Sequence, residues 1–347
     1  MAGPPEIAVV VGDYSRRRYL PFAIASLGAQ TLSRERFEIV VTKNWRDPEV
    51  DRSLAALRAT VLFDEEPRIG RWLRHAVNAC RAPIITFLDD DDEFEPERLE
   101  RVLEVFAKHP DLGFYRNRVR VIDREGRPIP FERWREHERD EAFDHLGPLY
   151  FSPRTKDRLL EVATRTTHAT FNTSSMALRR ELLDGDLGDG FEATQLEDLY
   201  LFLTGVLAPG GVYLDDRRLT RFRFYPGNVS RMVRWLGYAE WSYRDMAAVA
   251  ARHGRPDFAT WLADQSVHYG RMYRGSELVE RVAARGGRRE VAQRTADYLR
   301  LLGRHPKERA WSVDTWAAAL YGVAYVGLSG PVARFAQRRR VARGIVA

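Results

Sequence analysis

The sequence IITFLDDDDEF, residues 84–94, decides how the fold of this chain is interpreted. Its first part, Ile84–Leu88, is a short apolar run of the kind found in strands that are buried on both faces of a parallel sheet. Four aspartates follow this run directly. In open α/β sheets, ligands bind beside the carboxyl ends of the strands. The stretch therefore predicts a ligand site at the end of a buried strand.

The four adjacent aspartates predict a cation. Carboxylates this close raise one another's pKa unless a cation or backbone N–H groups compensate them. Alternate residues at a strand end face the same side, so Asp89 and Asp91 can reach one ion. Oxygen ligands without His or Cys nearby favour Mg²⁺ or Mn²⁺ over zinc, and Mg²⁺ keeps positions open for phosphate oxygens. The alternative is a solvated acidic loop in which Asp92 or Glu93 helps to cap the next helix.

Working outward, other short apolar runs resemble strands, and helical patterns separate them. The expected strands are Ile7–Val11, Glu38–Thr42, Thr60–Phe63, Ile84–Leu88, Gly113–Ile122 and Thr170–Leu178. The expected helices lie at 19–30, 48–58, 70–81, from 96 onward and at 194–207. This alternation predicts an α/β fold with a mostly parallel sheet flanked by helices and right-handed crossovers. Because the pattern is helical from Arg231 onward, we expect a catalytic domain at 1–230 and a helical region at 231–347.

Charge is divided unevenly along the 347 residues. The net charge is +6, but residues 231–347 hold 21 Lys and Arg against 10 Asp and Glu, which leaves the first 230 residues acidic. An acidic front suits a metal and a nucleotide, whereas a basic tail suits an anionic surface, either nucleic acid or lipid head groups. The single cysteine, Cys80, excludes an internal disulfide framework and a cysteine-based zinc site. The start of the chain has no pattern of a signal peptide, so we expect a cytoplasmic protein.

The segment Thr315–Ala333 carries no charged residue over 19 positions. It approaches the length of a membrane span, but it is rich in Ala and Gly and contains Pro331, so its insertion would be marginal. Five arginines and several interfacial aromatics surround it. We expect a helical hairpin that lies against the catalytic domain or in the membrane interface, with a peripheral contact through 311–343 at the cytoplasmic face. The alternative is a buried helix that closes the core. The tail lacks a nucleic-acid recognition motif, so we expect no nucleic-acid partner.

Several features, taken in order, resemble glycosyltransferase family 2, whose members have the GT-A fold. The match covers roughly two-thirds of the chain. It rests on Asp13-Tyr14-Ser15-Arg16 after the first strand, the helix end at 26–31, the strand at 37–41, FLDDDDEF with Pro96-Glu97-Arg98-Leu99 behind it, and the pair Glu197-Asp198.

The resemblance implies a role for each of these residues. Asp89 and Asp91 match the family's Asp-x-Asp motif and would hold a divalent ion on the diphosphate of a nucleotide sugar. Asp90 would contact the ribose or the donor sugar. In the loop after the first strand, Tyr14 would stack on the base, with Asp13 beside it and Arg16 facing a phosphate.

The acidic pair Glu197-Asp198 implies the general base. We assign this role to Asp198, because Thr194 and Glu197 have the spacing of a capping box that would explain Glu197 structurally. The segment 171–175 is expected to line the acceptor pocket. Arg223 and its neighbour Arg221 resemble a segment that closes over the diphosphate, and arginine suits bidentate contact with phosphate.

One departure from the family concerns the nucleotide. Many relatives that use uridine nucleotides have an aspartate after the second strand, where this chain has Lys43 and Asn44. A lysine cannot accept the uracil N–H, whereas an asparagine amide can both donate and accept. A uridine donor is therefore in doubt, and guanosine, another nucleotide or a sugar on a lipid phosphate stays open.

The sequence thus predicts a metal-dependent inverting glycosyltransferase that uses a nucleotide-sugar donor and a glycan or lipid-linked acceptor. A non-catalytic nucleotide-sugar or glycan binder on the same fold is the alternative. A nucleotidyltransferase is disfavoured, because GDYSRRR after the first strand contains one glycine and no glycine-rich phosphate loop.

Overall fold

A computed structural model of the chain describes residues 3–13, 17–66, 68–129, 147–165, 170–225, 233–304, 313–327 and 332. Two compact units divide between Phe224 and Tyr225, close to the expected boundary at 230. The first unit contains a mixed sheet with the strand order β3-β2-β1-β4-β8-β6-β9-β5, and β7 pairs with β9. The strands are β1 (Ile7–Asp13), β2 (Phe37–Lys43), β3 (Thr60–Phe63), β4 (Ile84–Asp89), β5 (Glu93–Phe94), β6 (Leu112–Ile122), β7 (Leu149–Phe151), β8 (Met176–Arg179) and β9 (Gly211–Arg223).

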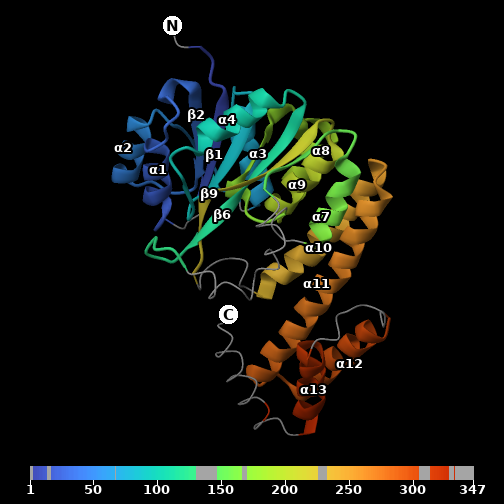
Figure 1. Cartoon of the computed structure of the whole chain (residues 1–347). Helices are drawn as coiled ribbons and strands as arrows, with labels where there is room; N and C mark the ends of the chain where they lie inside the picture. Colours follow the sequence, from blue (N-terminus) through green and yellow to red (C-terminus); the bar gives the residue numbers. More distant parts are fainter. Residues whose placement is uncertain are drawn as a thin grey trace. The chain divides into compact units, whose positions relative to one another are not determined.

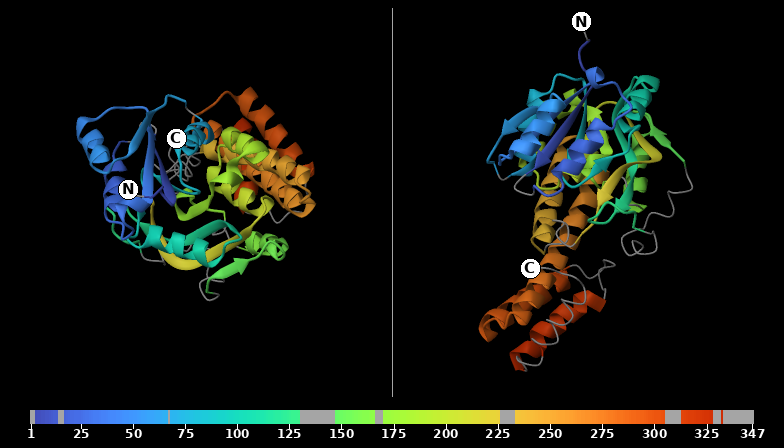
Figure 2. Two further views of the ribbon diagram at one scale, coloured as in Figure 1. Left: turned by 90° about the horizontal axis from the view of Figure 1, so that it is seen from above. Right: turned by 90° about the vertical axis from the view of Figure 1, so that its left-hand side faces the viewer.

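Helices cover both faces of this sheet (Figures 1 and 2). Those of the first unit are α1 (Leu20–Gly28), α2 (Pro48–Ala56), α3 (Ile69–Ala79), α4 (Arg98–Lys108), α7 (Leu159–Arg165), α8 (Gly185–Ala193) and α9 (Glu197–Leu207). Residues of α1, α2 and α4 share one core with Val11 and other alternate residues of β1. The next residue, Gly12, faces the other way, where a Cβ would lie 1.8 Å from the Trp72 ring of α3. The rings of Phe87 and Phe191 meet on that second face, 6.1 Å apart.

The parallel part of the sheet agrees with the sequence. Strands β3, β2, β1 and β4 are parallel neighbours, so the predicted strands and the α/β class are confirmed. The predicted strand at 170–178 is wrong in its first half, because the 3₁₀ turn Thr173–Ser175 precedes β8. The predicted helix at 194–207 begins three residues later, at Glu197.

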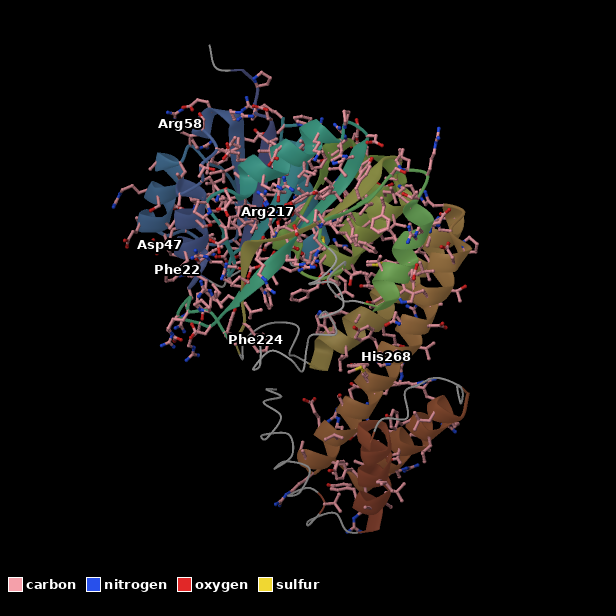
Figure 3. The ribbon with its side chains drawn as sticks, viewed as in Figure 1. Phe22, Asp47, Arg58, Arg217, Phe224 and His268 are labelled. Carbon is pink, nitrogen blue, oxygen red and sulfur yellow. The ribbon has the colours of Figure 1, made fainter. Side chains whose placement is uncertain are left out.

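The loop that follows β2 leads directly into α2. Asp47 (Figure 3) accepts hydrogen bonds from the main-chain N–H groups of Glu49 and Val50, at 2.9 and 3.1 Å. Pro48 occupies the first turn, where its missing N–H has no cost. This start of α2 fixes the position of Asp51, which matters for the site below.

The second unit is helical, as expected, with α10 (Val233–Arg252), α11 (Pro256–Ala283), α12 (Arg288–Arg304) and α13 (Val313–Gly327). Helices α10 and α11 pack through the stacked rings of Tyr243 and Tyr269, 5.1 Å apart. A second core joins α11, α12 and α13. None of the described helices combines the length and the apolar character that crossing a bilayer requires.

Helix α13 occupies the first part of the uncharged segment 315–333. Its inner face enters the helical core through Ala318, Ala319 and Tyr325. Its outer face leaves Leu320 and Val323 exposed. Residues 313–327 therefore form one helix packed on α11 and α12. This arrangement resembles the alternative of a helix that closes the core more than the expected hairpin. The rest of the expected hairpin lies mostly outside the described residues.

Candidate active site

Three strands bring their carboxyl ends to one edge of the sheet. In the registers of β1 with β2 and β4, Asp13 lies opposite Lys43, and Gly12 lies opposite Asp89. Asp13 and Lys43 are each 1% exposed. The parallel arrangement therefore gathers residues from positions 13, 43 and 89 at the place where an open α/β sheet binds its ligand.

The acidic run begins at this edge and turns into the protein. Asp90, Asp91 and Asp92 are buried, whereas Asp89 at the end of β4 is partly exposed. A turn closes the run, with the Asp92 N–H donating to the Asp89 carbonyl at 3.1 Å. The alternative of a solvated acidic loop therefore does not hold, because most of the run is buried.

Asp92 is held by three hydrogen bonds. Its Oδ2 accepts hydrogen bonds from Asn172 Nδ2 and Ser174 Oγ, both at 2.7 Å, and its Oδ1 accepts from the Arg223 N–H at 2.9 Å. Burial, followed by the charges of Asp91 and Asp89, raises the pKa of Asp92 well above its usual range. This mutual effect indicates that the carboxylates lie close together.

The residues present fit a divalent cation. Asp89 and Asp91 offer carboxylate oxygens, which are the ligands that Mg²⁺ and Mn²⁺ prefer. Across the described residues, no three His, Cys, Asp or Glu side chains form a complete metal cage. A cation held by one or two carboxylates and completed by phosphate oxygens needs no such cage.

Arg223 lies behind the acidic run. Its side chain is fully buried, its Nε donates to the Asp91 carbonyl at 2.9 Å, and its Nη1 donates to the Asp123 carbonyl at 3.0 Å. It also forms an ion pair with Glu93. The guanidinium that we assigned to the diphosphate therefore holds the main chain of the run, and its contact with a ligand stays a prediction.

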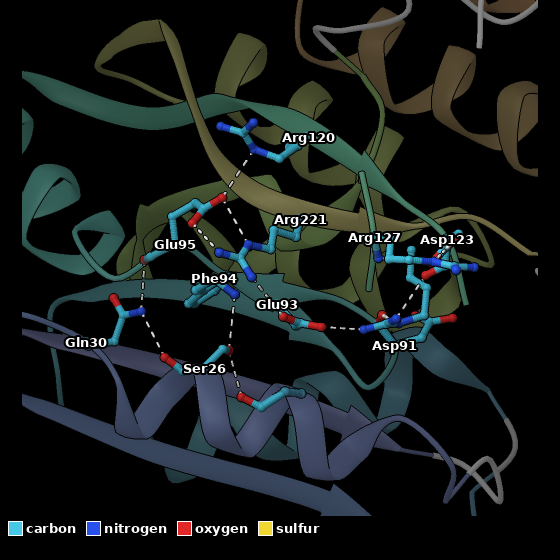
Figure 4. A network of polar contacts seen from close by, with 12 residues as sticks. Ser26, Gln30, Asp91, Glu93, Phe94, Glu95, Arg120, Asp123, Arg127 and Arg221 are labelled. Carbon is cyan, nitrogen blue, oxygen red and sulfur yellow. Dashed lines mark hydrogen bonds and ion pairs between the residues drawn. The ribbon is translucent and has the colours of Figure 1, made fainter. Parts of the chain in front are cut away.

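Further ion pairs hold the short strand β5 in place (Figure 4). Arg221 reaches Glu95 at 2.9 Å and Glu93 at 3.4 Å. On the other side, the Phe94 N–H donates to Ser26 Oγ of α1 at 3.1 Å. The segment that follows the aspartates is thus held from both β9 and α1, which leaves the run little freedom to move.

The end of β2 forms a compact group around Trp45. Lys43 pairs with Asp51 of α2, and its Nζ lies 4.6 Å from the centre of the Trp45 ring. Arg17 lies over the same ring at 5.2 Å. Asn44, beside them, is partly exposed. Trp45 was not predicted from the sequence to belong to this group. Its position two residues after the end of a strand could have indicated it.

Two predicted nucleotide ligands, Tyr14 and Arg16, lie outside the described residues. The predicted ligands Asp13 and Asp90 are both buried beside the sheet edge, at 1% and 0% exposure.

Asp198 lies in the first turn of α9 and is partly exposed. Its Oδ1 accepts from the Leu199 N–H at 2.7 Å, and its Oδ2 accepts from the Asn172 N–H at 3.1 Å. Burial raises the pKa of Asp198, while these N–H groups and the charge of Arg116 oppose the rise. A carboxylate with a raised pKa that can still ionise has the properties of a general base.

The expected capping box is wrong. Leu196 precedes α9 without a side-chain cap, and Thr194 Oγ1 accepts instead from the Leu196 N–H at 3.1 Å. Glu197 is therefore not explained by a cap, and it lies next to Asp198 in the first turn of α9, partly exposed.

Asn172 connects the two groups of carboxylates. Its side chain bonds to Asp92 at the end of β4, and its main chain bonds to Asp198 on α9. The structure thus brings together the acidic run and the predicted base, which are about a hundred residues apart in the sequence.

Comparison with known proteins identifies the family and the fold. The family model for Glycosyl transferase family 2 matches residues 8–186. An uncharacterized glycosyltransferase of Nostoc sp. is 28% identical over 187 residues, which are 52% of this chain and 52% of that protein. The putative glycosyltransferase EpsH of Bacillus subtilis is 26% identical over 113 residues, 31% of this chain and 32% of its own. The chain thus matches about half or less of the length of these relatives.

Solved structures of S. aureus TarS share the fold. The complex of TarS residues 1–349 with UDP-GlcNAc gives a TM-score of 0.57 at 14% identity and covers 98% of this chain and 92% of that one. The complex with UDP gives 0.52 at 13% identity with the same coverage.

Proposed function

The chain belongs to glycosyl transferase family 2 and has the GT-A fold, and from this premise we propose that it transfers a sugar, with inversion, from a nucleotide-diphosphate sugar to a hydroxyl acceptor. Asp198 is the general base in this proposal, with Glu197 beside it. Asp89 and Asp91 hold the cation, Mg²⁺ or Mn²⁺, on the diphosphate.

One observation supports this assignment above the others: Asn172 bonds both to the acidic run and to Asp198. A sugar transferase must bring the leaving diphosphate and the attacking hydroxyl to the same carbon atom. Carboxylates for a cation and a carboxylate for a proton should then lie near each other. A protein that only binds a nucleotide sugar needs the first group and has no use for the second.

The reaction follows from these positions. Asp198 takes the proton of the acceptor hydroxyl while the acceptor oxygen forms a bond to the anomeric carbon. The bond from that carbon to the phosphate oxygen breaks, and its electron pair leaves with the nucleoside diphosphate. Asp89 and Asp91 would hold a divalent cation, which would supply positive charge for this leaving group. The N–H groups of Leu199 and Asn172 keep Asp198 oriented and ionised.

For the donor, the solved TarS complexes hold UDP and UDP-GlcNAc. In this chain Lys43 is paired with Asp51, so we assign recognition of the base edge to Asn44. Its amide both donates and accepts, which leaves uridine and guanosine donors for experiment to separate. Stacking by Tyr14 and phosphate contact by Arg16 complete the donor site in this proposal, beside Asp13 and Asp90.

For the acceptor, we propose a glycan or a lipid-linked sugar reached at a membrane surface. Among the described side chains of α13, the large apolar residues Leu320, Val323 and Val326 are exposed. Tyr325 of the same helix bonds to the Gly286 carbonyl at 2.9 Å, beside the exposed Arg285 and Arg288. Exposed apolar side chains on a helix of a unit with an excess of basic residues suit an anionic lipid surface. Sedimentation with phosphatidylserine vesicles but not phosphatidylcholine vesicles supports this contact, and no sedimentation with either contradicts it.

The function is tested by release of nucleoside diphosphate from a panel of UDP-, GDP- and dTDP-sugars. Mn²⁺, Mg²⁺ and a chelator are compared, with Asp91→Ala and Asp198→Asn as variants. We expect metal-dependent release from one donor, lost in both variants, while Asp198→Asn still binds that donor in calorimetry. Donor binding that is equal in all three proteins, without release from any, favours the non-catalytic binder. Independently of activity, Mn²⁺ should raise the unfolding temperature of the wild type and leave that of Asp91→Ala unchanged.

A further inference from the structure

Asn172 occupies an uncommon backbone conformation. Its φ is +69° with ψ of 102°, and it directly precedes the turn Thr173–Ser175. The residue is 5% exposed. Positive φ is rare for residues other than glycine, and asparagine and aspartate adopt it more readily than most. The surrounding structure therefore fixes this residue against a local preference, which is typical of functional positions.

Two different groups of Asn172 bind two different carboxylates. The side-chain Nδ2 donates to Asp92 at 2.7 Å, and the main-chain N–H donates to Asp198 at 3.1 Å. Within the described part of the chain, the amide Oδ1 is buried without a hydrogen-bond partner. The bond to Asp92 thus sets the orientation of the amide.

Asparagine meets all of these requirements, and glycine, aspartate and alanine do not. Glycine would accept the positive φ but has no side-chain donor. Aspartate would also accept the conformation, but it would direct a carboxylate at Asp92. Alanine would be strained at this φ and would lack the donor.

We propose that Asn172 is a positioning residue. It holds the general base Asp198 at a fixed position relative to the acidic run. This inference rests on the proposed function, because it takes Asp198 to be the base.

Asp198 is held by two N–H groups of different origin. Leu199 belongs to the same helix and moves with it, so its bond fixes the carboxylate only relative to α9. Among the described residues, the bond from Asn172 links the carboxylate to the segment that follows β4, through Asp92. The charged groups described around Asp198 are Glu197 on its own helix, Asp92 beyond Asn172, and Arg116 on β6, which donates to the Phe171 carbonyl at 2.9 Å. Of the two described hydrogen bonds to Asp198, loss of the one from Asn172 would leave the bond within its own helix.

The test compares Asn172→Gly with Ser174→Ala. Each substitution removes one of the two 2.7 Å hydrogen bonds to Asp92 Oδ2, and only position 172 borders Asp198. Asn172→Gly keeps the positive φ and the main-chain N–H, so the fold should persist. The assay is release of nucleoside diphosphate from the nucleotide sugar that is active in the panel, followed as kcat, KM and the dependence of kcat on pH.

We expect Asn172→Gly to lower kcat by about 10- to 100-fold, the scale of a small misplacement of a catalytic group, with a donor KM close to that of the wild type. The acid limb of its kcat profile should move to higher pH, because a weakened N–H bond favours the ionised Asp198 less. Ser174→Ala should leave the position of that limb unchanged. Identical pH profiles for the two variants, or a limb unmoved in Asn172→Gly, would overturn the proposal.

A double-mutant cycle separates this inference from the proposed function. With Asp198→Asn present, Asn172→Gly should have no further effect on kcat, because its target is already lost. Effects that multiply would overturn the positioning role even if Asp198 is the base. A fully active Asp198→Asn would instead overturn the base assignment itself. Should Asn172→Gly fail to fold, Asn172→Asp serves in its place and should move the acid limb further upward, since it adds a negative charge.

Discussion

Replacing Arg223 with methionine tests whether this residue supports the acidic run or binds the ligand. Methionine keeps much of the aliphatic stem and removes the guanidinium. That group is fully buried, donates to the carbonyls of Asp91 and Asp123, and pairs with Glu93, whose side chain is 14% exposed. Removing one partner of a buried ion pair costs about 3–5 kcal/mol. Arg221 would still reach Glu93 at 3.4 Å, but the bonds to the two main-chain carbonyls would be lost together with the ion pair.

The matched control is Arg221→Met, two residues earlier on the same strand. Arg221 also pairs with Glu93 and with Glu95, but its side chain is 38% exposed. Solvent screens such pairs, so the expected cost is about 0–1 kcal/mol. A domain of this size loses about 2–4 °C of unfolding temperature per kcal/mol, so Arg223→Met should lower it by roughly 6–20 °C and Arg221→Met by at most about 4 °C.

Thermal unfolding followed by circular dichroism measures both variants, and calorimetry measures the binding of nucleoside diphosphate with Mn²⁺. Equal unfolding temperatures for Arg223→Met and Arg221→Met would refute the supporting role. If Arg223→Met unfolded like the wild type and lost nucleotide affinity, the assignment to the diphosphate made from the sequence would be right.

Other predictions follow from single contacts. Asp198→Asn should lower kcat by about 10²–10⁴-fold in the release assay while donor affinity in calorimetry stays unchanged. Because the pKa of Asp198 is raised above its ordinary value of 3.8, the kcat of the wild type should fall as pH decreases through a value above 3.8, and a profile that is flat down to pH 4 would contradict this. Gly12→Ala should destabilise the fold by about 1–3 kcal/mol in urea unfolding, because its Cβ would overlap the Trp72 ring, whereas Gly28→Ala, with its nearest atom at 3.7 Å, should not. A chelator should abolish release, and added Mn²⁺ should restore it in the wild type but not in Asp91→Ala.

The parallel half of the sheet could be predicted because its signal is local. Each of its strands is a short apolar run, and burial on both faces requires that pattern. The aspartates after β4 and the acid at the start of α9 were equally visible, since strand ends and first helical turns have known places in an α/β fold. The prediction for Thr194 failed because more than one nearby main-chain N–H group can bond to its hydroxyl oxygen. Thr194 was expected to cap α9, and it accepts instead from the N–H of Leu196, which precedes that helix.

The contacts that organise the site could not be predicted. Asn172 and Asp92 are 80 residues apart, and Arg223 reaches the Asp91 carbonyl across 132. No spacing in the sequence encodes such pairs. An arginine near a nucleotide site suggests phosphate contact, and the structure adds that Arg223 is buried and holds the main chain at Asp91 and Asp123.

The two carboxylates that Asn172 joins, Asp92 and the partly exposed Asp198, differ in the groups that act on their pKa values, and the difference favours Asp198 as the base. Asp92 lies beside Asp91 and Asp89, so burial and like charges act together to raise its pKa. At Asp198, burial is opposed by two main-chain N–H groups and by the charge of Arg116. Environments that push the pKa values of neighbouring acids apart give them different tasks. In our proposal Asp198, whose ionised form these groups stabilise, exchanges the proton of the acceptor, whereas Asp92, with three donors on its oxygens, holds the strand end in place.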